Sequence, residues 1–217
     1  MKLFEIHHTM NPEMAADQIM LHCKPFLDQI KYKAADLIMY RGSKSKDRQY
    51  MKVDPGSGLR TIIGHNPNRT TVDTPPALHE ALNKIYIELF GLPFRNGTFA
   101  TGSYVQSTGY GNQTFVVLPI GEFKFLWSPL VEDAFIGYDM MDYITPPKVA
   151  VTRKPKEIDL DELKEETLDL GYKTTDLIGA IQKKHEIMLY CDHCIVLRAK
   201  EDNPLAVLQS IQRRGEL

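Results

Sequence analysis

The sequence predicts an α+β protein in which a β-sheet core is covered by helices grouped around it. Apolar runs with the length of buried strands are separated by segments that have the apolar periodicity and the end signals of helices. The chain has 217 residues, of which 43% are hydrophobic, so it can build one sizeable core. We therefore expect a single domain that spans residues 1–217.

Capping residues mark several of the predicted helices. The first helix begins with Asn11, a preferred N-cap residue, and Pro12, which is favoured at the first helical position. In the clearest helix the leucines and isoleucines fall on one stripe, Thr74 can cap the start and Gly91 can end it. Helices are expected at 11–23, 74–91, 130–144, 159–170, 175–184 and 203–214.

The predicted strands are short runs rich in aliphatic, aromatic and β-branched residues. They lie at 35–42, 99–103, 114–120, 122–128, 186–191 and 194–200. The last two are expected to form a hairpin around the two-residue turn Asp192-His193. Residues 43–75 are rich in Gly, Pro, Ser and Asn, and we expect an irregular loop that is either mobile or functional.

The overall charge and hydropathy exclude two classes of protein. A net charge of −2 and a pI of about 6.4 are not those of a polycation that coats nucleic acid, although they are compatible with a local basic surface. No window approaches the roughly 18 apolar residues of a membrane span. The first residues lack the apolar region of a secretion signal, so a cytoplasmic protein without membrane contact is expected.

The three cysteines, Cys23, Cys191 and Cys194, are too sparse for a disulfide framework and fit a reducing compartment. Residues 191–194 read Cys-Asp-His-Cys, but a zinc site needs two more ligands at a suitable spacing, and we find none in the sequence. We expect these cysteines to pack across the predicted hairpin turn, and no metal site is predicted.

Three short stretches carry residues that could form a chemical site. Arg41 follows a buried run and precedes Gly42, so its guanidinium can fork two hydrogen bonds onto a phosphate or carboxylate where the backbone can be approached closely. Thr101 and Ser103 are two residues apart on a predicted strand, so both hydroxyls are expected to face one pocket. Glu186 is a carboxylate at the start of an apolar strand.

Each stretch taken alone also has an ordinary structural explanation. An arginine at a strand end is commonly part of an ion pair, hydroxyls two residues apart can belong to a strand surface, and an acidic residue can be a solvated strand end. The Gly-rich segment 107–113 can either form a simple turn or offer backbone N–H groups and an aromatic face, Tyr110, to a ligand.

Three short motifs, taken in chain order, resemble the three-part signature of the ADP-ribosyltransferase fold, in its Arg-Ser-Glu, toxin-like class. They are Tyr-Arg-Gly at 40–42, Phe-Ala-Thr-Gly-Ser at 99–103 and Lys-His-Glu-Ile-Met-Leu at 184–189. The resemblance covers residues 36–199 and includes a helix between the first two motifs, where the family has one. It implies a split antiparallel β-sheet core with flanking helices, and the activity of a mono-ADP-ribosyltransferase.

The resemblance also implies that NAD is bound as a co-substrate, that nicotinamide leaves, and that ADP-ribose passes to a macromolecular acceptor, either protein or nucleic acid. Loss of nicotinamide builds positive charge on a ribose carbon, which the carboxylate of Glu186 can stabilise. Arg41 is expected at the diphosphate, and Tyr110 against the nicotinamide. The expected NAD-binding residues are Arg41, Gly42, Thr101, Ser103 and Tyr110, and the expected catalytic residues are Glu186, Arg41 and Ser103.

Two positions depart from the family pattern. Gly102 replaces the central hydroxyl residue of the second motif, and Lys184 stands where the family has a Glu or Gln that helps to select the acceptor. Two alternatives therefore stay open: a binding module that keeps the NAD fold without turnover, and a nucleic-acid-binding protein that uses the basic loop 41–52. Strand geometry predicts that Lys184 shares the side of Glu186, so guanidinium acceptors are expected to be poor.

Overall fold

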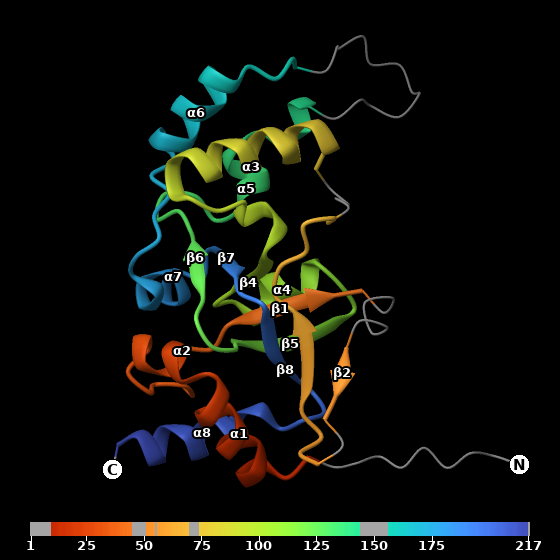
Figure 1. Ribbon diagram of the computed structural model, residues 1–217, viewed down its shortest axis with the longest axis vertical. Helices are drawn as coiled ribbons and strands as arrows, with labels where there is room; N and C mark the ends of the chain where they lie inside the picture. Colours follow the sequence, from red (N-terminus) through yellow and green to blue (C-terminus); the bar gives the residue numbers. More distant parts are fainter. Residues whose placement is uncertain (1–9, 45–50, 55, 70–73, 144–155, 217) are drawn as a thin grey trace, which may run out of the picture.

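The structure is a computed structural model, which describes residues 10–44, 51–54, 56–69, 74–143 and 156–216 (Figure 1). The described strands form one sheet in the order β2-β3-β8-β5-β1-β4-β7-β6, in which neighbouring strands are antiparallel. The strands are β1 (Tyr40–Ser43), β2 (Lys52–Val53), β3 (Arg60–Ile63), β4 (Thr98–Thr101), β5 (Gln113–Pro119), β6 (Lys124–Leu126), β7 (Glu186–Tyr190) and β8 (His193–Arg198).

Helices lie at both ends of this sheet (Figure 1), so the predicted α+β class is confirmed. The helices are α1 (Pro12–His22), α2 (Lys24–Gln29), α3 (Pro76–Phe90), α4 (Tyr104–Gly109), α5 (Ala134–Gly137), α6 (Leu160–Asp169), α7 (Leu177–Lys183) and α8 (Pro204–Gly215), with short 3₁₀ helices η2 (Phe94–Asn96) and η3 (Met140–Tyr143).

The sheet has a narrow junction in its middle. In the described residues, β1 and β4 are joined by the single residue pair Tyr40–Thr101. By contrast, five residue pairs join β5 to β8 and four join β4 to β7. The sheet therefore has a larger part, β2-β3-β8-β5-β1, and a smaller part, β4-β7-β6. The sheet stays continuous through this one pair, so the expected split of the core stays a prediction.

Most of the helices gather at the two ends of the molecule (Figure 1). The helices α1, α2 and α8 gather at one end of the molecule, beside the larger part, and α3, α5 and α6 gather at the opposite end (Figure 1). The buried apolar side chains form two clusters. One cluster includes Ile19 of α1, Val196 of β8 and Leu208 of α8, and the other includes Leu82 of α3 and Met188 of β7. The first cluster also includes side chains of β4, β6 and β7, so it continues across the junction, whereas the second packs against the smaller part of the sheet.

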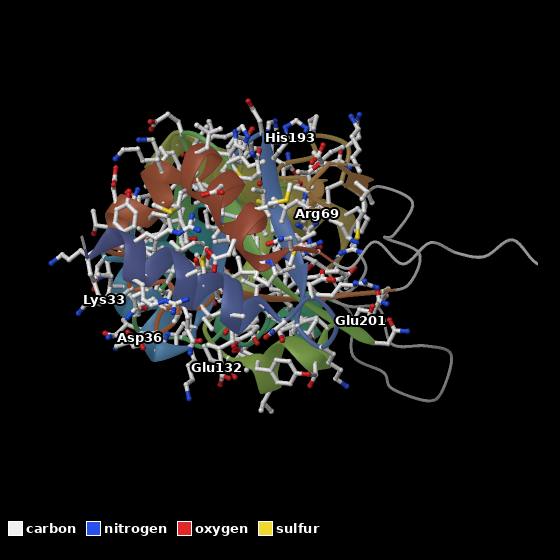
Figure 2. All side chains as sticks on the ribbon, turned by 90° about the horizontal axis from the view of Figure 1, so that it is seen from below. Lys33, Asp36, Arg69, Glu132, His193 and Glu201 are labelled. Carbon is white, nitrogen blue, oxygen red and sulfur yellow. The ribbon has the colours of Figure 1, made fainter. Side chains whose placement is uncertain are left out.

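The helices α1 and α8 lie side by side although they come from opposite ends of the chain (Figure 2). Ile19 and Ile211 are fully buried, whereas nearer the surface Arg214 forms ion pairs with Glu13 and Asp17. Because the two carboxylates are largely exposed, these ion pairs stabilise the contact less than the apolar burial does.

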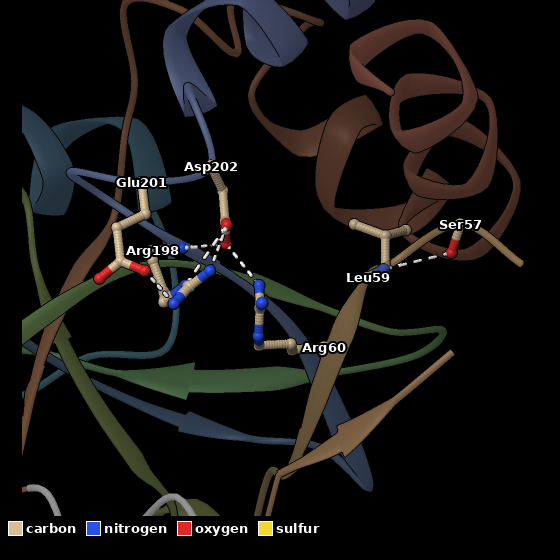
Figure 3. A network of polar contacts seen from close by, with 6 residues as sticks. All are labelled: Ser57, Leu59, Arg60, Arg198, Glu201 and Asp202. Atoms are coloured by element: carbon tan, nitrogen blue, oxygen red, sulfur yellow. Dashed lines mark hydrogen bonds and ion pairs between the residues drawn. The ribbon is translucent and has the colours of Figure 1, made fainter. Parts of the chain in front are cut away.

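A polar network fixes the larger part of the sheet near its outer strands (Figure 3). The carboxylate of Asp202 accepts hydrogen bonds from Arg60 Nη1 and from the backbone N–H of Arg198, each at 2.7 Å. Asp202 is only 8% exposed, so these donors, rather than water, stabilise its charge. The network ties β3 to the turn that follows β8.

Local signals predicted two helix ends correctly. At the start of α1, Asn11 Oδ1 accepts a hydrogen bond of 2.9 Å from the backbone N–H two residues ahead, and Gly91 ends α3 in the left-handed conformation with a φ of 82°. Thr74, by contrast, does not cap α3. Pro75 occupies the N-cap position, and the Thr74 hydroxyl instead accepts a hydrogen bond of 2.8 Å from Arg95 Nη2.

The predicted hairpin over residues 186–200 is wrong. The strand β7 pairs with β4 and β6, whereas β8 pairs with β3 and β5, so the chain crosses between the two parts of the sheet after Tyr190. An apolar pattern identifies a strand without identifying its partner, which explains the error. The sulfur atoms of Cys191 and Cys194 do meet at this crossing, 3.3 Å apart.

Other differences concern short or irregular segments. The predicted loop 43–75 contains β2 and β3, and the Gly-rich segment 107–113 begins inside helix α4. The strand predicted at 35–42 starts only at Tyr40, and the helix predicted at 130–144 is reduced to α5 and η3. Elements this short are formed by tertiary contacts rather than by local propensity, so the sequence pattern gives little sign of them.

Candidate active site

The three predicted motifs meet at the junction of the sheet. Tyr40 of β1 pairs with Thr101 of β4, and Thr101 pairs on its other side with Glu186 of β7. A cavity of about 560 Å³ lies at this point, a size in the range of small-molecule and cofactor sites. Five of the six residues predicted from the sequence line it: Arg41, Gly42, Thr101, Tyr110 and Glu186.

Glu186 is held firmly in the cavity wall. Its backbone N–H donates to the carbonyl oxygen of Glu132 at 2.7 Å, and its Oε1 accepts from the N–H of Ala134 at 3.3 Å. Burial raises the pKa of the Glu186 carboxyl to about 7, with Arg95 opposing the rise and Asp133 adding to it. A pKa raised in this way is a common property of carboxyls in active sites.

Arg41 and Gly42 reach the cavity from β1. Arg41 Nη1 lies 3.5 Å from the carbonyl oxygen of Phe99, so its guanidinium points across the junction toward β4. A Cβ atom on Gly42 would come within 2.1 Å of the carbonyl oxygen of Ser107. The glycine is therefore required for the close contact between β1 and α4, and this contact brings α4 to the cavity.

The two hydroxyls of the second motif do not share one face. β4 ends at Thr101, so the alternation of a strand does not extend to Ser103. Thr101 Oγ1 lies 2.5 Å from Gln106 Oε1 and 2.8 Å from the carbonyl oxygen of Lys184, and it accepts from the N–H of Ser103 at 3.1 Å. Its hydroxyl thus connects the start of α4 to the end of α7.

Ser103 lies outside the cavity lining. It is the N-cap residue of α4, and its hydroxyl oxygen accepts a hydrogen bond of 3.2 Å from the N–H of Gln106. Tyr110, directly after α4, does line the cavity, and its hydroxyl donates to Asp133 Oδ2 at 3.3 Å. The chain around α4 therefore contributes Tyr110 to the site directly and Ser103 only through the position of the helix.

Several lining residues were not predicted from the sequence, and two of them are arginines. The guanidinium carbons of Arg69 and Arg95 lie 4.3 and 5.1 Å from the ring centre of Phe99. Such contacts between a cation and an aromatic face hold the guanidinium groups in place. Arg95 is only 8% exposed, and no carboxylate of the described residues lies within ion-pair distance of it.

His79 of α3 forms another part of the wall that was not predicted. Its Nε2 lies 2.9 Å from Asn96 Oδ1, and burial lowers the pKa of the imidazole. Within the described part of the chain, Nδ1 of His79 and Nε of Arg95 are buried without a hydrogen-bond partner. Buried polar atoms without partners are uncommon in folded proteins, and both of these belong to residues that line the cavity.

The two departures from the family pattern have different explanations in the structure. A Cβ atom on Gly102 would lie 1.9 Å from the carbonyl oxygen of Ile181, so the close packing of α7 requires glycine there. Lys184 is not on a strand but ends α7 in the left-handed conformation, with a φ of 64°, and it is exposed and does not line the cavity. The expectation that Lys184 selects the acceptor from beside Glu186 therefore loses its geometric basis.

The remaining predictions from the sequence are answered only in part. Of the basic loop 41–52, residues 45–50 lie outside the described residues, and Lys44 lines the cavity. The part of the chain that the structure describes contains no cluster of three His, Cys, Asp or Glu side chains suited to a metal ion. In that same part, none of the helices has both the length and the apolar character needed to cross a bilayer.

The cavity combines features that suit a ligand with both anionic and developing cationic groups. Arginine side chains from three segments face it, and the Glu186 carboxyl lies in the same wall beside Asp133. Aromatic rings of Tyr40, Phe99 and Tyr110 complete the lining. Comparison of the chain with protein-family models, with curated proteins and with solved structures finds no match, so the site is interpreted from its own residues.

Proposed function

We propose that this protein is a mono-ADP-ribosyltransferase with an ADP-ribosyltransferase-like fold. It binds NAD in the cavity at the sheet junction, releases nicotinamide and transfers ADP-ribose to a macromolecular acceptor. One observation supports this most strongly: Arg41, Thr101 and Glu186, which are far apart in the sequence, line one cavity on three adjacent strands, β1, β4 and β7. This is the arrangement that the resemblance of the three motifs implies.

The chemistry of NAD cleavage gives Glu186 a role. The bond between the nicotinamide nitrogen and the ribose carbon breaks, its electron pair stays with nicotinamide, and the ribose carbon becomes positively charged. A carboxylate fixed beside that carbon stabilises the charge as it develops, and comparable contacts in glycoside hydrolysis contribute several kcal/mol. Because two backbone groups hold Glu186, little reorganisation is needed when the charge forms.

The diphosphate of NAD gives the arginines a role. Guanidinium groups match phosphate oxygens with paired hydrogen bonds, and Arg41, Arg69 and Arg95 all line the cavity. Arg95 is the clearest case, since it is largely buried and no carboxylate of the described residues lies within ion-pair distance of it. Glu186 already attracts Arg95 from a distance, and an anionic ligand would add a direct counter-charge.

The alternative of a binding module without turnover has less support. It rested on Gly102 and Lys184, and the packing of Ile181 against Gly102 explains the glycine without reference to catalysis. Lys184 lies outside the cavity lining, so its charge does not oppose the reaction there. A carboxyl with a pKa of about 7 is also costly for a fold to keep, which favours a catalytic role for Glu186.

The test is release of nicotinamide from NAD by the wild type, by Glu186→Gln and by Glu132→Gln. Glu132 is an exposed neighbour whose side chain does not line the cavity, so it is a matched control. We expect Glu186→Gln to lose activity about a hundred- to a thousandfold while still binding NAD, and Glu132→Gln to stay near the wild type. Equal rates in the wild type and Glu186→Gln would refute the proposed function.

A further inference from the structure

Asp133 lies directly beside Glu186, because the residues before and after Asp133 are both hydrogen-bonded to Glu186. The carbonyl oxygen of Glu132 accepts from the N–H of Glu186 at 2.7 Å, and the N–H of Ala134 donates to Glu186 Oε1 at 3.3 Å. Asp133 is the residue between these two hydrogen bonds, and its side chain lines the same cavity. A second carboxylate is thus fixed next to the first, although the two residues are far apart in sequence.

The two oxygen atoms of Asp133 have different surroundings. Oδ1 accepts from the N–H of Ile136 at 2.9 Å and so caps α5. Oδ2 accepts only from the hydroxyl of Tyr110 among the described residues, at 3.3 Å, which is long for a bond between a hydroxyl and a carboxylate. Oδ1 therefore fixes the side chain, and Oδ2 keeps most of its capacity to accept hydrogen bonds inside the cavity.

Two fixed carboxylates in one cavity can take different roles in a displacement reaction. In glycoside hydrolysis, one carboxyl group acts at the sugar carbon or its leaving group, and the other can act as the base that activates the incoming water. Glu186 takes the first role in the proposed function. From the position of Oδ2, we propose that Asp133 takes the second: it binds the attacking nucleophile and accepts its proton. This inference rests on the proposed function.

The step balances without any further reactant. The bond from the ribose carbon to nicotinamide breaks with its electron pair going to nicotinamide, and the nucleophile's oxygen or nitrogen bonds to the same carbon. The proton of the nucleophile passes to Asp133 Oδ2 and then to solvent. The acceptor is therefore a group with an O–H or N–H, neutral or cationic, since an anionic carboxylate would be repelled by Asp133 and has no proton to donate.

This assignment replaces the role first expected of Lys184. A lysine ammonium cannot accept a proton or a hydrogen bond, whereas the Asp133 carboxylate can do both. The aromatic residues Tyr110 and Phe135 line the cavity near Asp133 and give it flat faces against which a planar nucleophile could lie. A guanidinium is thus compatible with the site, contrary to what the position of Lys184 in the sequence predicted.

The variant Asp133→Asn tests the assignment because it separates chemistry from folding. Asn is as good an N-cap as Asp, so α5 keeps its first hydrogen bond, while Oδ2 becomes an amide nitrogen that cannot take a proton. The matched control is Asp159→Asn, the same change at the N-cap of α6 and outside the cavity lining. NAD hydrolysis, with water as the nucleophile, is measured with and without sodium azide, a nucleophile that has no proton to lose.

We expect Asp133→Asn to bind NAD within about twofold of the wild type and to hydrolyse it about a hundredfold more slowly. Azide should restore its nicotinamide release and yield ADP-ribosyl azide, identified by mass, while Asp159→Asn behaves as the wild type. Hydrolysis by Asp133→Asn at the wild-type rate, or a loss that azide does not restore, would overturn the inference. If the wild type itself releases no nicotinamide, the proposed function fails as well, so the two failures are distinguishable.

Discussion

Replacing Glu186 by Gln should make the folded protein more stable at pH 8, even though it removes activity. The pKa of the Glu186 carboxyl is raised from 4.5 to about 7 in the folded state. Between these values the folded chain binds more protons than the unfolded chain, so the free energy of unfolding decreases as the pH rises through this window. Above about pH 7 the full destabilising effect of the buried charge is present.

The size of the effect follows from the same values. At about 1.4 kcal/mol for each pKa unit, the rise from 4.5 to about 7 corresponds to about 3 kcal/mol of destabilisation at pH 8. Glu186→Gln removes the charge and keeps a carbonyl oxygen that can accept from the N–H of Ala134. The variant should therefore gain up to about 3 kcal/mol at pH 8, with Tm rising about 2–4 °C for each kcal/mol in a chain of this size.

Urea unfolding of the wild type and the variant at pH 8 and at pH 4.5 measures this difference. At pH 4.5 much of the wild-type carboxyl is uncharged in both states, so the stability difference should nearly vanish there. Glu132→Gln, at an exposed position, should show no such dependence on pH. If Glu186→Gln is no more stable than the wild type at pH 8, the carboxyl is not destabilised by burial, and the reasoning about its environment is wrong. The same titration predicts that activity rises with pH around pH 7.

Three further changes test other parts of the structure. Arg41→Lys keeps the charge and loses the paired hydrogen bonds, so the KM for NAD should rise about tenfold or more with a smaller loss of kcat. A fall in kcat with unchanged NAD affinity would contradict the phosphate-binding role. Gly102→Ala forces a Cβ atom against the Ile181 carbonyl oxygen and should destabilise the fold by about 1–3 kcal/mol in urea unfolding. Gly109→Ala is the control, because a Cβ atom there has no neighbour within 4 Å, and equal stability of the two variants would count against the packing explanation. Asp202→Asn removes the buried charge that Arg60 and Arg198 share, while Arg198 keeps its ion pair with Glu201, and should cost about 1–3 kcal/mol; an unchanged urea midpoint would show that the network of Figure 3 contributes nothing.

The parts of the fold that depend on local chemistry could be predicted from the sequence. Asn11 and Gly91 act on backbone groups within one helical turn, so their effect is readable without the rest of the chain. Strand partners are decided by contacts between distant segments. The crossing after Tyr190, where β7 and β8 separate into different parts of the sheet, has no local signal, and an apolar strand followed by a short turn gives the same pattern as a hairpin.

The same distinction applies to the candidate site. Arg41 and Glu186 stand at the ends of apolar strands, where an ionisable residue is conspicuous in the sequence. Asp133, Arg95 and His79 reach the cavity from a loop, a 3₁₀ helix and the face of α3, and nothing in their neighbouring residues distinguishes them from ordinary surface or capping residues. Only the folded chain shows that Asp133 is held between two hydrogen bonds to Glu186.

The most direct test of the proposed reaction uses NAD that carries one label in the nicotinamide ring and a different label in the adenine ring. Purified wild-type protein is incubated with this NAD, with and without a cell lysate as the source of acceptors, and both labels are followed in the small-molecule and macromolecular fractions. We predict that the nicotinamide label is released as free nicotinamide, and that the adenine label appears in equal amount as free ADP-ribose or bound to macromolecules. If both labels remain together in intact NAD after prolonged incubation with stoichiometric protein, the cavity at the sheet junction does not cleave NAD and the proposed function is contradicted.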